Sequence, residues 1–458
     1  MTDVNYANLA ALKGLLKRAA IDAYMKQGKW GWVVTDGHYE IPGSSSHKIT
    51  RPGEDGEGGG DWSGEFWEEW FVGGDKDREW KGHMDEVRTR VNNALRPWED
   101  LPDPATFDSY IEDLRQANGK LAVVTATSGG VATGAGKIGA QLKIIEENSS
   151  AMSGGIISAF KSKFLLELGK AIGGHHGLTI ILGQAMTAEQ NLLKQARQDV
   201  AQAVASATAA LDACAKGGDP KMSFEFKVAG AVLAGVTAFA TGGATVALSG
   251  AGAGLTLLTT LAEESENKAK EPASKDYEGL MKGFEDSLGG INKAIKNEEG
   301  GVRDNLKTNL SKLQVDEASY NLTNPMQNVS DDSQLNTSDS RAIIHNRSLV
   351  FEITDTAMPT IADELVAAKD LVWAGWSATP YYRDPGIGLG ETGPYTQWGE
   401  LAGPLWRLIG DLEWEVRNGA VTLKLAIEDM GQVDTDAKDA LEKHAESIKG
   451  YTNYQVPK

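Results

Sequence analysis

Cysteine and positive charge are both scarce in this sequence. Cys214 is the only cysteine among 458 residues, which excludes a disulfide or a cysteine-based metal site within the chain. Lysine and arginine total 45 against 64 aspartates and glutamates, so the net charge is −19. A chain this acidic is not expected to bind nucleic acid, or an anionic membrane surface at equilibrium.

Motifs that carry catalysis or hold a cofactor are also missing. The adjacent histidines at 175–176 point to different helical faces, which is poor geometry for a metal ion, and no HExxH spacing occurs. The run Gly129–Lys137 has the glycines of a phosphate-binding loop, but their spacing is wrong and no Ser or Thr follows the lysine. The acidic cluster Glu65, Glu68 and Glu69 predicts a solvated helix face. We therefore expect no enzyme activity, no metal and no cofactor.

The most prominent feature that is present is an uncharged run from Val228 to Ala262, which is longer than the ~20 apolar residues that span a bilayer. A glycine pair near its middle predicts a turn between two short arms. Three interpretations stay open: a buried core hairpin, a sheltered element that inserts into a membrane after a conformational change, and a constitutive transmembrane segment. For the second interpretation, the candidate membrane-inserting residues are Val228, Gly242, Gly243, Leu255 and Leu258.

Helical periodicity dominates the rest of the chain. An amphipathic pattern predicts helices over 77–95 and 105–114, and an antiparallel hairpin whose first arm starts at 141 and whose second arm is 178–215. The near-heptad seam over 277–313, interrupted at two glycine pairs, is expected to pack on 178–215.

Residues 31–61 are rich in glycine, proline, serine and aspartate, and they predict an exposed loop or short hairpin. We expect almost no strand in the chain apart from short pieces near Trp32–Val34. The glycine-rich loop at 53–60 is left open as a partner-binding site.

The predicted fold class is all-α, with long antiparallel helical hairpins or a bundle, a buried glycine-rich apolar hairpin and a smaller C-terminal helical-hairpin domain. The predicted domains are a bundle over 1–315, a polar linker over 316–348 and a helical hairpin over 349–458. Tryptophans 398, 406 and 414 recur every eight residues and form a slanting ridge. We interpret this ridge as hairpin core, with a docking surface as the alternative.

Two short motifs resemble the turns of a known family. Trp62-Ser63-Gly64 fits a Trp-x-Gly triplet, and Met152-Ser153-Gly154 resembles the same turn with methionine in place of tryptophan. A helix, such a turn and a second antiparallel helix resemble the WXG-motif superfamily, whose members are exported by type VII (ESX) secretion in actinobacteria and relatives. The resemblance implies that Trp62, Gly64, Met152 and Gly154 belong to export or partner motifs.

The C-terminal region resembles the long second helix of the helical-hairpin proteins of that family. Their helix ends with a Tyr-x-x-x-Asp/Glu export signal. Met430 stands at the position of the tyrosine here, and Asp434 follows four residues later. The signal therefore departs from the family pattern at Met430, and the resemblance implies a secretion machinery or a helical partner protein as the binding partner.

The expected function is that of a leaderless secreted helical protein that acts in protein interaction or assembly. Charged residues from Lys13 to Asp22 interrupt the apolar core that a Sec signal needs. We expect the protein in the cytoplasm before export, and secreted or on the cell surface afterwards, with an oligomer left open. The alternatives are an α-helical pore-forming protein that uses 228–262, and a structural component of a surface or injection assembly.

Overall fold

The computed structural model describes residues 3–28, 31–42, 44–63, 76–123, 136–153, 155–222, 226–228, 230–232, 239, 255–256, 258, 274–322, 346–428 and 443. The helices are α1 (Leu9–Gln27), α3 (Lys76–Leu95), α4 (Asp108–Lys120), α5 (Lys137–Ser150), α6 (Gly155–Ala159), α7 (Leu166–Ala215), α9 (Tyr277–Val315), α11 (Arg347–Glu352), α12 (Met358–Ala374) and α13 (Tyr395–Glu428). The strands are β1 (Val33–Val34), β2 (His38–Ile41), β3 (Ser44–Thr50) and β4 (Trp62–Ser63). The mainly helical character that the sequence predicts is confirmed.

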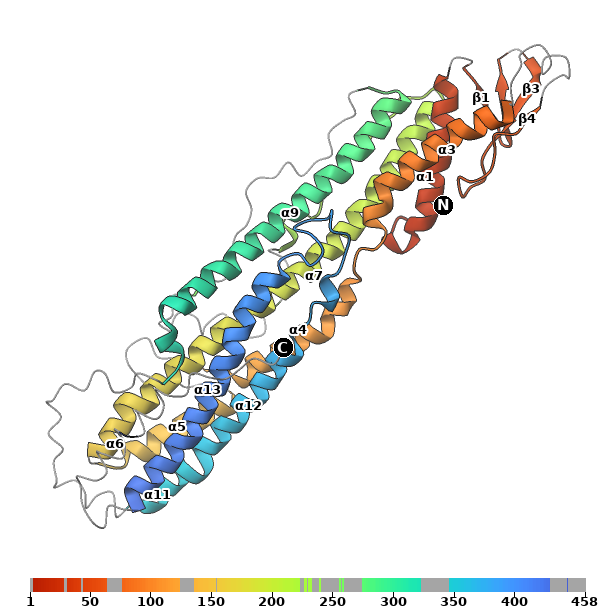
Figure 1. The fold of residues 1–458 in the computed structure, drawn as a ribbon. Coiled ribbons are helices and arrows are strands. Elements are labelled where there is room, and N and C mark those ends of the chain that lie inside the picture. The colour runs from red at the N-terminus through yellow and green to blue at the C-terminus, as the bar shows by residue number, and fades with distance from the viewer. Residues whose placement is uncertain are drawn as a thin grey trace.

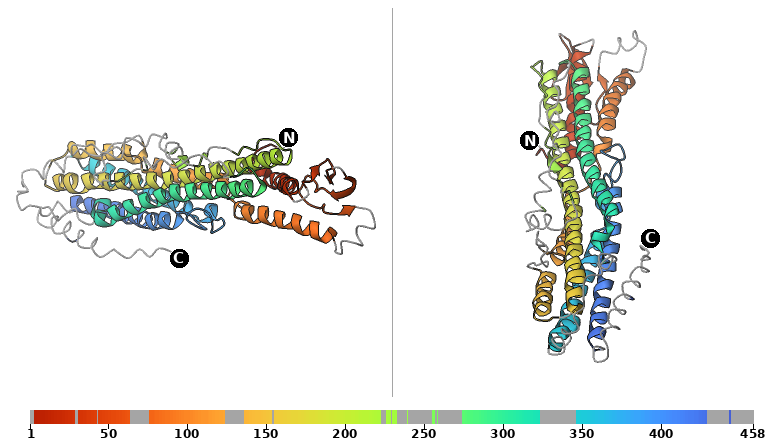
Figure 2. Two further views of the ribbon diagram at one scale, coloured as in Figure 1. Left: turned by 90° about the horizontal axis from the view of Figure 1, so that it is seen from above. Right: turned by 90° about the vertical axis from the view of Figure 1, so that its left-hand side faces the viewer.

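The molecule is an elongated bundle whose axis is α7 (Figure 1). α1 packs along the part of α7 that lies near the sheet, α9 runs along α7 from that end to well past its middle, and α4 and α13 pack along other parts of α7. α12 packs on α4 and α13. The two further views show the same rod, with the sheet at one end and α11 at the other (Figure 2). The predicted packing of the 277–313 helix on the alanine-rich helix is confirmed, because α9 lies along α7.

The predicted start of a separate helical arm at 178 is wrong, because α7 continues unbroken from Leu166 to Ala215, after a π-helical turn over Phe160–Leu165. Glycines inside α7 permit close packing and do not end the helix. A Cβ atom at Gly174 would lie 2.7 Å from the Tyr320 ring, and one at Gly183 would lie 2.0 Å from the Phe239 ring. Each glycine costs about 1 kcal/mol of helix propensity, which close packing of an aromatic ring offsets.

The 277–313 seam belongs to a single helix, since α9 has 39 residues and continues through both glycine pairs that interrupt the apolar pattern. Gly290 again leaves room for an aromatic ring, because a Cβ atom there would lie 2.8 Å from the Phe226 ring. Asp276 caps the start of α9 by accepting a hydrogen bond from the Gly279 amide. Glycines on α7 and α9 thus make room for Phe239 and Phe226, which lie within and just before the apolar stretch.

A four-stranded antiparallel sheet in the order β1-β2-β3-β4 occupies the region where an exposed loop or short hairpin was expected, and β1 lies within the short strand pieces expected near Trp32–Val34. The full extent of the sheet was missed because β1 and β4 are short and a bulge at Glu40/Ile41 shifts the register. Its inward side chains Tyr39 and Ile49 are fully buried. The Tyr39 hydroxyl donates to Asp22 Oδ1 at 2.8 Å, which ties the sheet to α1.

The two predicted modules pack on each other along the rod. α13 contacts both α7 and α9, and α12 contacts α4. The first residues of the predicted polar linker are packed too, since Tyr320 and Leu322 are buried. The middle of that linker, 323–345, lies outside the described residues, and the division into domains stays a prediction.

Candidate functional site

The described residues of the apolar stretch lie against α7 and α9. Val228, Val232, Phe239 and Leu258 are buried in the same core as the long helices, and Leu255 packs partly buried against it. Two of the predicted membrane-inserting residues, Val228 and Leu258, are therefore shielded from water. Gly242 and Gly243, which carry the predicted turn, lie outside the described residues.

Acidic side chains hold the start of the stretch through its backbone. Asp199 Oδ2 on α7 accepts hydrogen bonds from the amides of Lys227 at 2.7 Å and Val228 at 2.9 Å. Glu298 Oε1 on α9 accepts from the Gly230 amide at 2.8 Å. We call Asp199 and Glu298 the carboxylate clasp. These amides donate to side chains and not to the carbonyl groups of a helix or a sheet. The carboxylates therefore supply the hydrogen-bond acceptors that these backbone amides need.

Amide side chains hold the other end. Asn309 Oδ1 on α9 accepts from the Thr256 amide at 2.9 Å, and its Nδ2 donates to the Thr256 carbonyl at 2.9 Å. Asn305 Nδ2 donates to the same carbonyl at 3.1 Å. We call Asn305 and Asn309 the amide clasp. They share one face of α9 with Glu298, because position 305 follows 298 by about two helical turns and position 309 follows 305 by about one.

Burial changes the proton affinity of the carboxylate clasp. Loss of solvent raises the pKa of Asp199 to about 6, against the opposing effect of the Val228 and Lys227 amides and of the Lys227 charge. Burial also raises the pKa of Glu298, while the Gly230 and Val232 amides lower it. Both carboxyl groups hold a proton at higher pH than exposed ones do.

A second polar centre lies at mid-rod, where the loop 383–393 meets α7 and α9. Arg383 Nη1 donates to Glu189 Oε1 at 2.8 Å, and Arg383 Nη2 donates to Glu299 Oε1. All three side chains have no solvent exposure. Burial first, and the Glu189 charge second, raise the pKa of Glu299 well above its ordinary value. Two carboxylates facing one guanidinium in a dry site therefore favour retention of a proton.

The adjacent histidines are both buried inside α7. His175 Nε2 lies 2.8 Å from the Tyr320 carbonyl oxygen, and burial lowers the pKa of each histidine to about 4. Glu415 Oε2 on α13 accepts from the Leu322 amide at 2.9 Å, and burial raises its pKa to about 8. The segment after α9 is thus attached to α7 and to α13.

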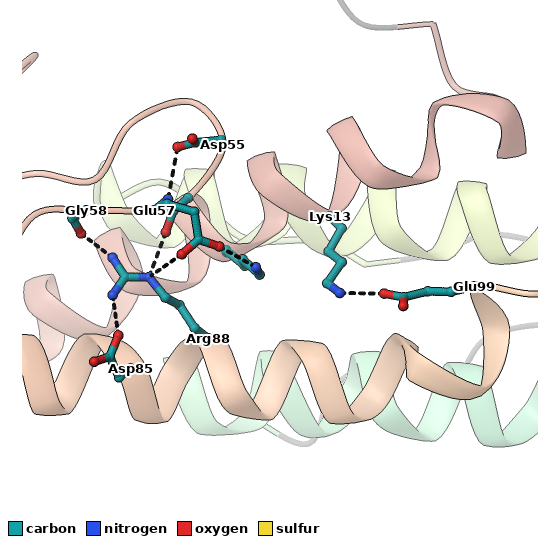
Figure 3. A network of polar contacts seen from close by, with 9 residues as sticks. Lys13, Asp55, Glu57, Gly58, Asp85, Arg88 and Glu99 are labelled. Carbon is teal, nitrogen blue, oxygen red and sulfur yellow. Dashed lines mark hydrogen bonds and ion pairs between the residues drawn. The ribbon is translucent and has the colours of Figure 1, made fainter.

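The glycine-rich loop at 53–60 is folded onto α1 and α3 (Figure 3). Arg88 Nε donates to the Gly56 carbonyl at 2.8 Å, Arg88 Nη2 donates to the Gly58 carbonyl, and Lys17 Nζ pairs with Glu57 at 2.6 Å. Gly56 and Gly58 have φ of +75° and +69°, which L side chains rarely adopt. A role of this loop in partner binding stays a prediction.

The predicted motif residues fall in different settings. Trp62 lies in β4 and packs edge-on against Trp32, so a strand, and not a helix, leads into the Trp-x-Gly triplet. Met152 is buried in the turn between α5 and α6, and its part in an export or partner motif stays a prediction. Gly64, Gly154, Met430 and Asp434 lie outside the described residues.

The other sequence candidates have structural roles where they are described. Trp398 is buried and its Nε1 donates to the Leu182 carbonyl at 3.0 Å, while Trp406 is also buried. Lys137, at the end of the glycine-rich run, pairs with Glu364 on α12 at 2.9 Å. The acidic cluster Glu65, Glu68 and Glu69 lies outside the described residues.

The clasp residues were not singled out in the sequence. Asp199 precedes Val200 in the apolar stripe of α7, so an acidic residue beside the buried face was the available signal. Such a residue is almost never buried without a partner. Nothing in the sequence identifies that partner, because the Asp199 contacts are backbone amides 28 and 29 residues further on.

Among the described helices, none is both long and apolar enough to cross a membrane. The same residues contain no group of three or more histidine, cysteine, aspartate or glutamate side chains placed to hold a metal ion. Neither a protein-family model, a curated protein nor a solved structure matches this chain.

Proposed function

We propose that this chain is a secreted helical protein, of the type VII kind, that acts in protein interaction or assembly and not in catalysis. The observation that carries the proposal is the turn at Met152, which joins α5 to the long α6–α7 arm. α5 contacts the π-helical turn between α6 and α7, so the two arms lie together. The Trp62 setting in a strand gives the proposal no support.

Export is tested in a host that carries a type VII machinery and in a matched host that lacks it. The protein is expected in the culture medium of the first host alone. Met430→Ala and Asp434→Ala are expected to reduce export, with Lys443→Ala as the control on the same C-terminal segment. Equal amounts in both media, or export that neither substitution changes, would contradict the proposal.

A second candidate function is insertion into a lipid bilayer, and the two clasps favour it. They hold an uncharged stretch by side-chain bonds to its backbone, and such bonds can be exchanged for others without unfolding α7 or α9. Dye release from vesicles tests this function, with a double variant Ala238→Asp and Val246→Asp beside the parent. Release by the parent that a folded variant loses supports insertion. A parent that releases no dye contradicts it.

A further inference from the structure

Two exposed aromatic side chains lie close to the connection between α12 and α13. Trp373 is the next-to-last residue of α12 and is 46% exposed, and Tyr382 lies in the connection and is 52% exposed. Among the described residues, these two are the only aromatic members of the exposed large apolar side chains. Single exposed apolar side chains are ordinary on a protein surface, whereas a continuous group of them marks an interaction site.

Contacts between rings join the two side chains into one surface. The Trp373 and Trp376 rings have centroids 5.6 Å apart and planes at 74° to each other. Burial raises the pKa of Tyr395, a side-chain hydrogen bond with Trp376 lowers it, and the nearby Tyr382 phenol raises it. Gly399 on α13 permits this packing, because a Cβ atom there would lie 3.2 Å from Trp376 Nε1. We call Trp373, Trp376, Tyr382 and Tyr395 the aromatic surface.

Three exposed carboxylates without a cation belong to the same elements. Asp370 lies on α12 one helical turn before the exposed tryptophan, Glu391 lies in the connection, and Glu400 lies in the second turn of α13. Within the described part of the chain, none of these three side chains forms a hydrogen bond or an ion pair. By contrast, Asp363 of α12 pairs with Arg417 of α13 at 2.8 Å. Negative charge beside the aromatic surface is therefore left uncompensated.

The aromatic cluster already accepts a cation from its own chain. Lys369 Nζ lies 4.8 Å from the centre of the Trp406 ring, and that ring contacts Trp373 with centroids 5.9 Å apart. A cation over the face of an indole is attracted by the negative charge of the ring face. Trp406 is only 8% exposed, whereas the larger exposure of Trp373 leaves its indole open to a cation from another molecule.

We propose that the aromatic surface, with Asp370, Glu391 and Glu400, binds an arginine-rich segment of a partner protein. Arginine fits both parts of the site, because its planar guanidinium stacks on an aromatic ring and donates hydrogen bonds to carboxylates. A quaternary ammonium group, as in a choline headgroup, has no N–H to donate to the carboxylates. A proline-rich segment fits aromatic rings but brings no charge for the carboxylates.

The carboxylates come from α12, α13 and the connection between them, so the segment engages more than one of them through more than one arginine. The net charge of −19 adds a long-range attraction that speeds the encounter with a basic partner. The inference rests on the proposed role in protein interaction, and it names the chemistry of the partner. It does not depend on the route of export.

Isothermal titration calorimetry on the full chain at low salt tests the inference with a capped peptide of three arginines separated by glycines. The matched probe carries citrulline in place of each arginine, which keeps a planar hydrogen-bond donor and removes the charge. The arginine peptide is expected to bind about tenfold more tightly than the citrulline peptide, because it alone supplies cations. Equal affinities would overturn the proposal.

Substitutions of Trp373 test the contribution of the ring. Trp373→Leu keeps an apolar side chain and removes the ring face, so the affinity for the arginine peptide is expected to fall about 2–5-fold. Trp373→Phe keeps a ring and is expected to restore part of this loss. Circular dichroism should show unchanged helix content in both variants, since the side chain is half exposed. An affinity that Trp373→Leu leaves unchanged would overturn the proposal.

Substitutions of the carboxylates separate this site from the general charge of the chain. Asp370→Asn is expected to weaken binding of the arginine peptide about 2–5-fold, and added salt should weaken binding to the parent. Asp36→Asn is the matched control, because Asp36 is an exposed carboxylate in the turn between β1 and β2 at the sheet end of the rod. Equal losses for the two variants would mean attraction to an acidic protein as a whole, which overturns the site.

Two further measurements distinguish the remaining outcomes. Phosphatidylcholine vesicles that bind the parent and not Trp373→Leu, with no binding of the arginine peptide, would assign the surface to a choline headgroup and overturn the protein partner. Peptide binding by a chain that a type VII host does not export supports this inference and contradicts only the export part of the proposed function. Export of a chain that binds no arginine peptide supports the proposed function and overturns this inference.

Discussion

Two glycine-rich loops in this molecule are each held by an arginine, one inside the bundle and one at its surface. The loop 383–393 is held by Arg383, whose partners Glu189 and Glu299 have no exposure. The loop 53–60 is held by Arg88, whose ionic partners Glu57 and Asp85 are 55% and 68% exposed. Arg383 belongs to its loop and bonds to carboxylates of α7 and α9, whereas Arg88 belongs to α3 and bonds to carbonyl groups of its loop. The access of water to the ionic partners differs as well.

The difference shows that burial determines how much such an arginine contributes to the free energy of unfolding. At the surface, water replaces a lost partner and the net gain of an ion pair is small. In a dry site, removal of the cation leaves carboxylates that nothing solvates. The interior loop is therefore a joint between α7, α9 and the C-terminal helices, whereas the surface loop is a local attachment.

The largest expected effect is the loss of Arg383. Arg383→Met leaves Glu189 and Glu299 buried without a cation, and the expected loss in the free energy of unfolding is about 3–5 kcal/mol. Urea unfolding followed by circular dichroism measures it.

The control for this change is the triple variant Arg383→Met, Glu189→Gln, Glu299→Gln. It removes both charges with the cation, and it is expected to recover most of the loss. A triple variant no more stable than Arg383→Met would show that packing of the arginine, and not charge, holds the joint.

Glu415 sharpens the comparison, because it is a buried carboxyl group whose hydrogen bond comes from a backbone amide. Its pKa is about 8 in the folded protein and about 4.5 when exposed, so the folded state binds the extra proton between these values. Stability therefore falls as pH rises through this window, by about 1.4 kcal/mol per pH unit at most.

Urea unfolding between about pH 5 and about pH 8 tests this direction. Glu415→Gln keeps an acceptor for the Leu322 amide and removes the titration, so its stability is expected to fall less steeply than that of the parent. Glu400→Gln on the exposed side of α13 is the control. Identical slopes for the parent and Glu415→Gln would refute the assignment.

The helices of the bundle were predictable from local patterns. The apolar stripe of α7 and the seam of α9 predict two long helices that pack together, and this is what the structure contains. Their continuity through the glycine pairs was not predictable, because Tyr320 and Phe226 fill the space beside Gly174 and Gly290. Those aromatic partners are distant in sequence.

The candidate sites were predictable only in part. The composition of the sequence shows the uncharged stretch. Its attachment depends on hydrogen bonds between residues far apart in the chain, which no sequence pattern predicts. Arg383 lies 194 residues from Glu189 and 84 from Glu299. The full extent of the sheet was missed for a different reason, since β1 and β4 have two residues each and cannot show alternation.

A smaller effect is expected at the surface loop. Arg88→Met removes hydrogen bonds to the Gly56 and Gly58 carbonyls, and it is expected to cost about 1–2 kcal/mol. Hydrogen exchange of the Gly56 and Gly60 amides should show the loop 53–60 opening while the rod stays folded. Arg96→Met, at an exposed position after α3, is the control. A loss as large as that of Arg383→Met would remove the distinction between the two loops.

The smallest effect is expected for the pair between Lys13 on α1 and Glu99, beside the surface loop (Figure 3). Their side chains are 20% and 38% exposed, so water competes for both charges. A double-mutant cycle with Lys13→Met and Glu99→Gln is expected to give a coupling of about 0.2–1 kcal/mol. Added salt should reduce the coupling, because ions screen exposed charges. A coupling that salt leaves unchanged would mean that this pair is shielded like the Arg383 cluster, and exposure alone would then not separate the two loops.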